Sequence, residues 1–158
     1  MKKAPVVVVS AVCVVLGLAG QANAAIYYGT DGQDFFTGTS GIDTFWTYAG
    51  DDTVHGAGSR DNIHLGDGND LGTGDDGPDL LYAGMSTVLG IGDEIRGNNG
   101  NDEGYDEAGP DSDGFCGGPN DDYVNLFDGD GYDAANMGAG TDNWSKDPGD
   151  YVDPDAGC

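Results

Sequence analysis

Basic residues, glutamate and histidine are all scarce in this chain. Five Lys and Arg residues stand against 29 Asp and Glu residues, and the formal net charge is −24. This excess excludes binding to nucleic acid through the chain's own charge, and it makes a compact state self-repelling unless cations are bound. Only three of the acidic residues are Glu. Disordered acidic segments use glutamate freely, so the composition argues against a disordered acidic tail.

Long apolar runs are also missing, with one exception at the N-terminus. Lys2 and Lys3 precede an apolar run over 4–19, and Ala-Asn-Ala at 22–24 follows it. This order is typical of a cleaved export signal, predicted here over 1–24. The run is shorter than the roughly 20 residues of a membrane span, although an uncleaved N-terminal anchor stays open as an alternative. We therefore expect a secreted, extracellular protein, or a periplasmic one, whose mature chain does not insert into a membrane.

Cysteine is rare as well, with three residues in the chain. Cys13 lies inside the expected signal, which leaves Cys116 and Cys158. Export places this pair in an oxidising compartment, where a disulfide between them would tie the C-terminal tail to the second half of the chain. Two unpaired thiols are the alternative.

Aspartate and glycine are the abundant residues, and in the first half they recur with a period of nine. The aspartates of this series are Asp34, Asp43, Asp52, Asp61, Asp70 and Asp79. Two residues before five of them stand Gly32, Gly41, Gly50, Gly68 and Gly77. An apolar residue follows two positions after nearly every aspartate. A fixed short period of this kind predicts a repeat architecture.

The second half keeps the pattern less strictly. After a regular block over 25–82, we expect an inserted loop over 83–92, an irregular block over 93–144 and a tail over 145–158. The aspartates of the irregular block that we place in the series are Asp93, Asp102, Asp111 and Asp122. Its apolar column is poorer, because Gly104 and Asp113 fall at inward positions. This block therefore reads as a degraded version of the first.

These columns resemble the nonapeptide GGxGxDxUx of the RTX, or hemolysin-type, calcium-binding repeats. The best copies are GTSGIDTF at 38–45, GNNGND at 97–102 and GGPNDDYV at 117–124, and the resemblance extends over 29–144. It implies an all-β fold, a parallel β-roll (β-solenoid) in which two nonapeptides form one coil of 18 residues. It also implies several bound Ca²⁺ ions in the glycine- and aspartate-rich turns.

In such a roll, turns that are two repeats apart lie on the same edge. Ca²⁺ accepts six to eight oxygen ligands at about 2.3–2.6 Å, so carboxylates and backbone carbonyls of neighbouring turns suit it. We expect the metal sites at all the aspartates and glycines of the two series named above. The alternative for any one aspartate is that it caps its own turn through a hydrogen bond.

Aromatic residues share a second column. Trp46, His64 and Tyr82 follow one another at a spacing of eighteen and point outward, so we expect a ladder of rings on one sheet. The ladder either stabilises the sheet through cross-strand contacts or forms a contact surface for a glycan or partner protein. The other histidine, His55, falls on the opposite sheet, so the two histidines cannot form a catalytic or zinc site together.

We expect no enzymatic activity, because the sequence has no nucleophile elbow, phosphate loop or HExxH motif. The inward column offers one side chain per nine residues, so folding is expected to depend on calcium. Three roles remain: a calcium-dependent structural or adhesive protein of the cell exterior, a calcium buffer, and a remnant of an RTX-type secreted toxin or enzyme without its catalytic domain. Calcium is the expected partner, with a glycan or cell-surface protein as a possible second one.

Overall fold

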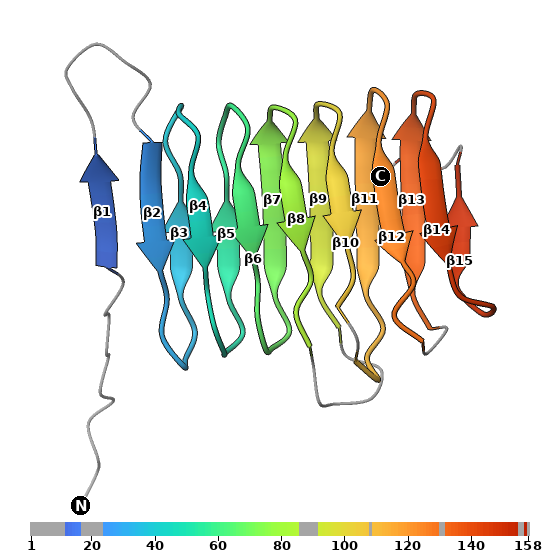
Figure 1. The fold of residues 1–158 in the computed structure, drawn as a ribbon, viewed down its shortest axis with the longest axis horizontal. Coiled ribbons are helices and arrows are strands. Elements are labelled where there is room, and N and C mark those ends of the chain that lie inside the picture. Colours follow the sequence, from blue (N-terminus) through green and yellow to red (C-terminus); the bar gives the residue numbers. More distant parts are fainter. Residues whose placement is uncertain are drawn as a thin grey trace, which may run out of the picture.

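The computed structural model describes residues 12–16, 24–85, 92–107, 109–129, 132–154 and 157. These residues form two sheets that lie against each other (Figure 1). The eight-stranded sheet consists, in spatial order, of β1 (Val12–Leu16), β2 (Ala24–Tyr28), β4 (Thr44–Trp46), β6 (Asn62–His64), β8 (Leu80–Tyr82), β10 (Glu103–Tyr105), β12 (Tyr123–Leu126) and β14 (Asn143–Lys146). The seven-stranded sheet consists of β3 (Phe35–Thr37), β5 (Thr53–His55), β7 (Leu71–Asp76), β9 (Glu94–Asn99), β11 (Gly114–Pro119), β13 (Ala134–Ala139) and β15 (Tyr151–Asp153).

Successive strands alternate between the two sheets, and the strands within each sheet pair in parallel. This is the predicted β-roll, built of coils with one strand in each sheet. The one antiparallel pair joins β1 to β2, with Val14 opposite Ile26. β1 lies within the expected export signal, most of which is outside the described residues. No helix in the described part of the chain is long and apolar enough to cross a membrane.

The core consists of one row of strand midpoints from each sheet, to which Leu65, Leu126 and Met137 are added from positions two residues further along the chain. The middle residue of each short strand points inward, and Phe45, Val54 and Ile63 have no exposed surface, because side chains alternate along a strand. Gly72 leaves a gap in this row, and Leu65 fills it: a Cβ at Gly72 would lie 3.0 Å from a Leu65 methyl carbon. The core is therefore continuous but only two side chains thick.

The turns at the two edges of the roll differ in length. We call the edge where the chain passes from the seven-stranded to the eight-stranded sheet the short edge, at the top of Figure 1, and the opposite edge the long edge. Buried inward residues on either side of the short edge are nine positions apart in both halves, as in Val54 and Ile63 or Phe115 and Val124. All the extra residues of the second half enter at the long edge.

The second block is regular in its coils, although Gly104 lies at an inward position as the sequence predicts. Its coils repeat every 20 residues, since Glu94 pairs with Gly114, and Gly114 pairs with Ala134. Two extra residues per coil move the register, so Phe115 and not Asp113 points into the core. Trp144 is 42% exposed because β14 is the last strand of its sheet. Of the expected loop over 83–92, residues 86–91 lie outside the described part.

Candidate metal sites

An aspartate precedes nearly every strand, and these aspartates form one ladder along each edge. On the short edge, the backbone N–H of Asp43 donates to Oδ1 of Asp61 at 2.7 Å, and the N–H of Asp61 donates to Oδ1 of Asp79 at 2.7 Å. The same bond continues along the short edge through Asp102, Asp122 and Asp142. On the long edge it joins Asp34, Asp52, Asp70, Asp93, Asp113, Asp133 and Asp150.

The ladders place the predicted aspartates on two edges as expected, with one correction. The expected register was wrong after Asp93, whose N–H donates to Asp113 at 2.5 Å and not to Asp111. The cause is the two-residue lengthening of the long-edge turns. Asp111 is buried, and it raises the pKa of Asp93 through its charge, but it lies outside the ladder.

The second oxygen of many ladder carboxylates is buried without a donor. Oδ2 has no hydrogen-bond partner in Asp52, Asp61, Asp70, Asp79, Asp102 and Asp122. A buried carboxylate oxygen that has lost its water and gained no partner is costly, and a bound cation removes that cost. These orphaned oxygens are the first sign that the ladders are built around cations.

Backbone carbonyls supply a second acceptor beside the orphaned oxygens. Gly56 lies five residues before Asp61, and a Cβ added to Gly56 would lie 2.6 Å from Asp61 Oδ2 and 2.6 Å from the carbonyl oxygen of Gly74 in the next coil. Glycine therefore keeps open a small space between two oxygens that cannot hydrogen-bond to each other. Carboxylate and carbonyl oxygens are the ligands that Ca²⁺ prefers, so the residues present fit this ion.

Sequence reasoning missed this glycine column. Its members on the short edge are Gly38, Gly56, Gly74, Gly97 and Gly117, each five residues before its ladder aspartate. The irregular spacing of the second half hides the column unless the coils are first separated into two edges. Two of the glycines predicted from the sequence, Gly50 and Gly77, have φ of 123° and 139° and so shape their turns.

Burial also changes the charge state of the ladder. Loss of solvent, helped by the charges of neighbouring aspartates such as Asp79 and Asp93, raises the pKa of Asp61 and of Asp70 to about 8. Burial raises the pKa of Asp102 and of Asp122 to about 7 in the same way. At neutral pH each of these carboxylates therefore needs a proton or a metal ion.

Some ladder aspartates cap their own turns, as the alternative prediction held. Oδ2 of Asp43 accepts the backbone N–H of Thr39 at 2.5 Å, and Oδ2 of Asp34 accepts that of Thr30 at 2.6 Å. Both turns belong to the first complete coil. Oδ2 of Asp93 likewise accepts the backbone N–H of Gly84 at 2.9 Å. The role of cation ligand is thus best supported at the ladder aspartates whose Oδ2 has no donor.

An acidic cluster that includes one ladder aspartate, Asp133, lies on the long edge. Asp106, Asp128 and Asp133 each offer a carboxylate oxygen, and these oxygens lie within 4.8 Å of one another. Burial and hydrogen bonds to Asp113 and Asp133 raise the pKa of Asp106 to about 11. Their spacing is close enough for the three carboxylates to hold one metal ion together.

The predicted ladder of rings is present and longer than expected. Trp46 and His64 stack at 3.8 Å between ring centroids with 4° between planes, and His64 and Tyr82 stack at 4.4 Å with 3°. Tyr105 extends the stack at 5.2 Å, and Tyr123 joins it in a tilted contact at 5.9 Å. A hollow of about 190 Å³ lies beside the first three rings. His55, as expected, lies on the other sheet, where Thr73 contacts it.

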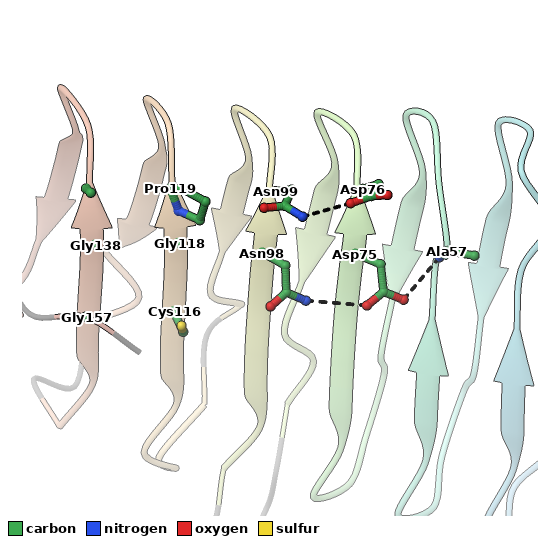
Figure 2. Close-up of a pocket in the computed structure, with 11 residues that line it drawn as sticks. Ala57, Asp75, Asp76, Asn98, Asn99, Cys116, Gly118, Pro119, Gly138 and Gly157 are labelled. Carbon is green, nitrogen blue, oxygen red and sulfur yellow. Dashed lines mark hydrogen bonds between the residues drawn. The ribbon is translucent and has the colours of Figure 1, made fainter.

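The outer face of the seven-stranded sheet carries a hollow of about 740 Å³ (Figure 2). Its polar side chains bind one another: Asn99 donates to Asp76 at 2.8 Å, and Asn98 donates to Asp75 at 3.4 Å. Cys116 also lines it and is disulfide-bonded. Cys158, its predicted partner, lies outside the described residues.

Coils that stack their glycine turns and aspartates in register define a parallel β-roll of the calcium-binding type. The model of the RTX calcium-binding nonapeptide repeat (4 copies) matches residues 28–63 and 64–86. Residues 28–86 are therefore repeats of the RTX calcium-binding family, as the sequence resemblance predicted. No curated protein and no solved structure matches the chain.

Proposed function

We propose that this protein is a non-catalytic β-roll of the cell exterior that folds around Ca²⁺ and serves a structural or adhesive role. The observation that carries the proposal is that the orphaned Oδ2 of a ladder aspartate, such as Asp61, lies beside a backbone carbonyl of the next coil, here that of Gly74. An ionised carboxylate and a carbonyl oxygen repel each other until a proton or a metal ion lies between them, and the metal ion leaves the carboxylate ionised. Each ion therefore joins one coil to the next.

Calcium is the cation that best suits these sites. The ligands are oxygens alone, which disfavours metals that select thiolate or imidazole. Mg²⁺ demands a strict octahedron and retains several waters, whereas Ca²⁺ tolerates the irregular ligand arrangement of stacked turns. A dissociation constant for Ca²⁺ of roughly 10⁻⁴–10⁻³ M, as in extracellular modules, suits a protein that folds on export.

Folding and calcium binding should be one process. The core has few side chains per coil, and a net charge of −24 opposes compaction. Because the ligands come together only in the folded coils, the binding free energy of the ions becomes folding free energy. A chain that stays unfolded until it meets calcium is well suited to passage out of a cell.

The ring ladder supports an adhesive role and favours a protein partner over a glycan. Sugars stack on free aromatic faces, but the faces of His64 and Tyr82 are covered by their neighbours in the stack. The ladder presents a row of ring edges beside the hollow of about 190 Å³, and its Trp46 is 39% exposed. Such an amphipathic aromatic surface is typical of protein interfaces.

Calorimetry tests the calcium proposal. Titration of the chelator-treated protein with Ca²⁺ should show several ions bound per chain together with the large heat of folding. A protein that binds no Ca²⁺ contradicts the proposal. For the ladder, capture of cell-surface proteins by the wild type but not by Trp46→Ala, each in Ca²⁺, supports adhesion through the rings. Equal capture by both variants would exclude Trp46 from the contact, and capture by neither would argue for a calcium buffer.

A further inference from the structure

The first coil of the roll is covered at its end by a strand that we expect the mature protein to lack. β1 pairs antiparallel with β2, at the left of Figure 1, and Val14 lies opposite Ile26. β1 belongs to the export signal expected over 1–24. Removal of that signal leaves β2, from Ala25 onward, as the edge strand of the eight-stranded sheet. β3 is already the edge strand of the other sheet, so both sheets then end in an open strand.

The two strands at this end carry no charged residue, although the chain as a whole is strongly acidic. β2 has the sequence AAIYY and β3 the sequence FFT. Edge strands of natural proteins are usually protected from further pairing by charged side chains or proline. The strands at the opposite end fit that rule, since β14 contains Lys146 and β15 contains Asp153. The end that begins with β2 is therefore the one open to another strand.

The core also reaches this end as aromatic rings. Tyr27 of β2 and Phe36 of β3 point inward, and their ring centroids lie 5.6 Å apart. In a stacked repeat each coil buries its apolar side against the next one, so a terminal coil needs a cover or a polar cap. Exposed large apolar side chains gather close to this end, at Tyr28, Phe35, Ile42, Trp46 and Tyr48. Without β1, the first coil has apolar surface and no cap of its own among the described residues.

We infer that signal removal uncovers a dimerisation surface, and that a second copy of the mature chain covers it end against end. A two-fold axis perpendicular to both sheets relates the two rolls. Such an axis reverses strand direction, so β2 pairs antiparallel with β2 of the second copy, which is the orientation that β1 has here. The same axis brings the two β3 strands together in the other sheet. This surface lies outside the aspartate ladders and goes beyond the proposed binding of calcium.

The sequence of β2 suits pairing with itself. A pair centred on Ile26, where β1 has Val14, places Tyr27 of each copy opposite Ala25 of the other. Directly opposite residues of an antiparallel pair point to the same face, and Ala25 and Tyr27 both point inward. A large ring thus lies beside a small side chain on each side of the axis, and the two cores become continuous.

The dimer also has a consequence for the proposed adhesive role. Because the axis is perpendicular to the sheets, the two eight-stranded sheets join edge to edge and face the same way. Both ring ladders, each beginning at Trp46, then lie on one continuous surface. Two linked copies of a weak contact surface bind a multivalent target more tightly than one copy does.

Sedimentation equilibrium of the mature protein in Ca²⁺ tests the inference. Intact mass confirms the N-terminus at residue 25, and circular dichroism confirms folding in the same samples. The wild type should sediment with twice the mass of one chain. Ile26→Lys sets two like charges side by side at the axis and should sediment as single chains at the same concentration. Asn62→Lys is the control and should remain dimeric, because Asn62 is half-buried in the same outward column but two strands further from the end.

Several results would overturn the inference. One is a wild type that is folded in Ca²⁺ but sediments as single chains, which would leave the proposed function intact. Another is a mass that rises past two chains with concentration, because open-ended growth requires head-to-tail stacking. Purified protein that retains residues 1–24 also overturns it, since β1 then keeps β2 covered.

A second pair of variants covers the case in which Ile26→Lys fails to fold. In Ile26→Cys the new thiols of the two copies lie opposite each other at the axis, so a short bifunctional thiol reagent should link two chains through residue 26. Asn62→Cys should not be linked, because the two copies of residue 62 are several strands apart. Absence of the residue 26 link in folded protein, or equal linking of both variants, contradicts the proposed pairing.

Discussion

Asp61 and Asp79 are joined by one hydrogen bond, in which the backbone N–H of Asp61 donates to Oδ1 of Asp79 at 2.7 Å. The bond turns the Asp79 carboxylate along the axis of the roll and leaves its Oδ2 buried without a donor. One oxygen thus fixes the register of adjacent coils while the other is available to a metal ion. Glutamate, one methylene longer, would displace both oxygens, which gives a physical reason for the near absence of Glu.

Replacing a ladder carboxylate should weaken calcium-dependent folding. Asp61→Asn keeps an acceptor for the N–H of Asp43 but removes the charge, so the calcium concentration at the folding midpoint should rise about tenfold, equivalent to ~1.4 kcal/mol. Asp67→Asn is the control, because Asp67 is exposed and outside the ladder. Circular dichroism during calcium titration gives both midpoints. Equal midpoints for the two variants would argue against a ligand role for Asp61.

A methyl group in the glycine column should act like loss of a ligand. In Gly74→Ala the added Cβ contacts Asp79 Oδ2, whereas in Gly32→Ala its nearest neighbour is 4.0 Å away. We expect Gly74→Ala to lower the melting temperature in Ca²⁺ and to raise the folding midpoint, and Gly32→Ala to change neither by much. Thermal denaturation at fixed Ca²⁺ distinguishes them, and similar losses in both variants would point to a general cost of replacing glycine.

Acid should stabilise the metal-free roll and weaken the metal-bound one. Burial raises the pKa of Asp61 and of Asp70 to about 8 in the folded state, whereas in the unfolded chain they titrate near 3.8. Folding without metal therefore takes up protons, and its stability increases as the pH falls from about 8 towards 4. Protons compete with Ca²⁺ for the same oxygens, so the calcium midpoint should rise over the same pH range. Circular dichroism at pH 5 and pH 8 in chelator checks the first effect; a chain that folds less at pH 5 than at pH 8 would contradict it.

The ring ladder should contribute to stability through stacking. His64→Ala opens a gap between Trp46 and Tyr82 and should cost about 1 kcal/mol in the free energy of unfolding in Ca²⁺. His64→Phe restores a ring without a titratable group and should recover most of that loss. Since burial lowers the pKa of His64, the wild-type stack should also stay neutral below the usual histidine range. If Ala and Phe variants unfold alike, stacking is not what the ladder contributes.

Much of the architecture could be predicted from the sequence, because the period of nine is strict between Asp34 and Asp79. Both the edge on which each aspartate lies and the inward position of Phe45 or Ile63 follow from that period alone. Asp113 could not be assigned to the long-edge ladder from the sequence. Two extra residues in a turn shift the aspartate column, and the sequence does not show at which position they are inserted. The backbone carbonyls that lie beside the ladder carboxylates, such as that of Gly74 beside Asp61, could not be predicted either. A carbonyl leaves no mark in the sequence, and its neighbour is known only once the coils are stacked.

Far-UV circular dichroism of the purified protein, with millimolar Ca²⁺ and with excess chelator, tests the central claim most directly. The account predicts a β-sheet spectrum in Ca²⁺ and a largely unfolded spectrum in chelator at pH 8, with full recovery when Ca²⁺ is restored. A folded β-sheet spectrum that is the same in chelator as in Ca²⁺ would contradict it.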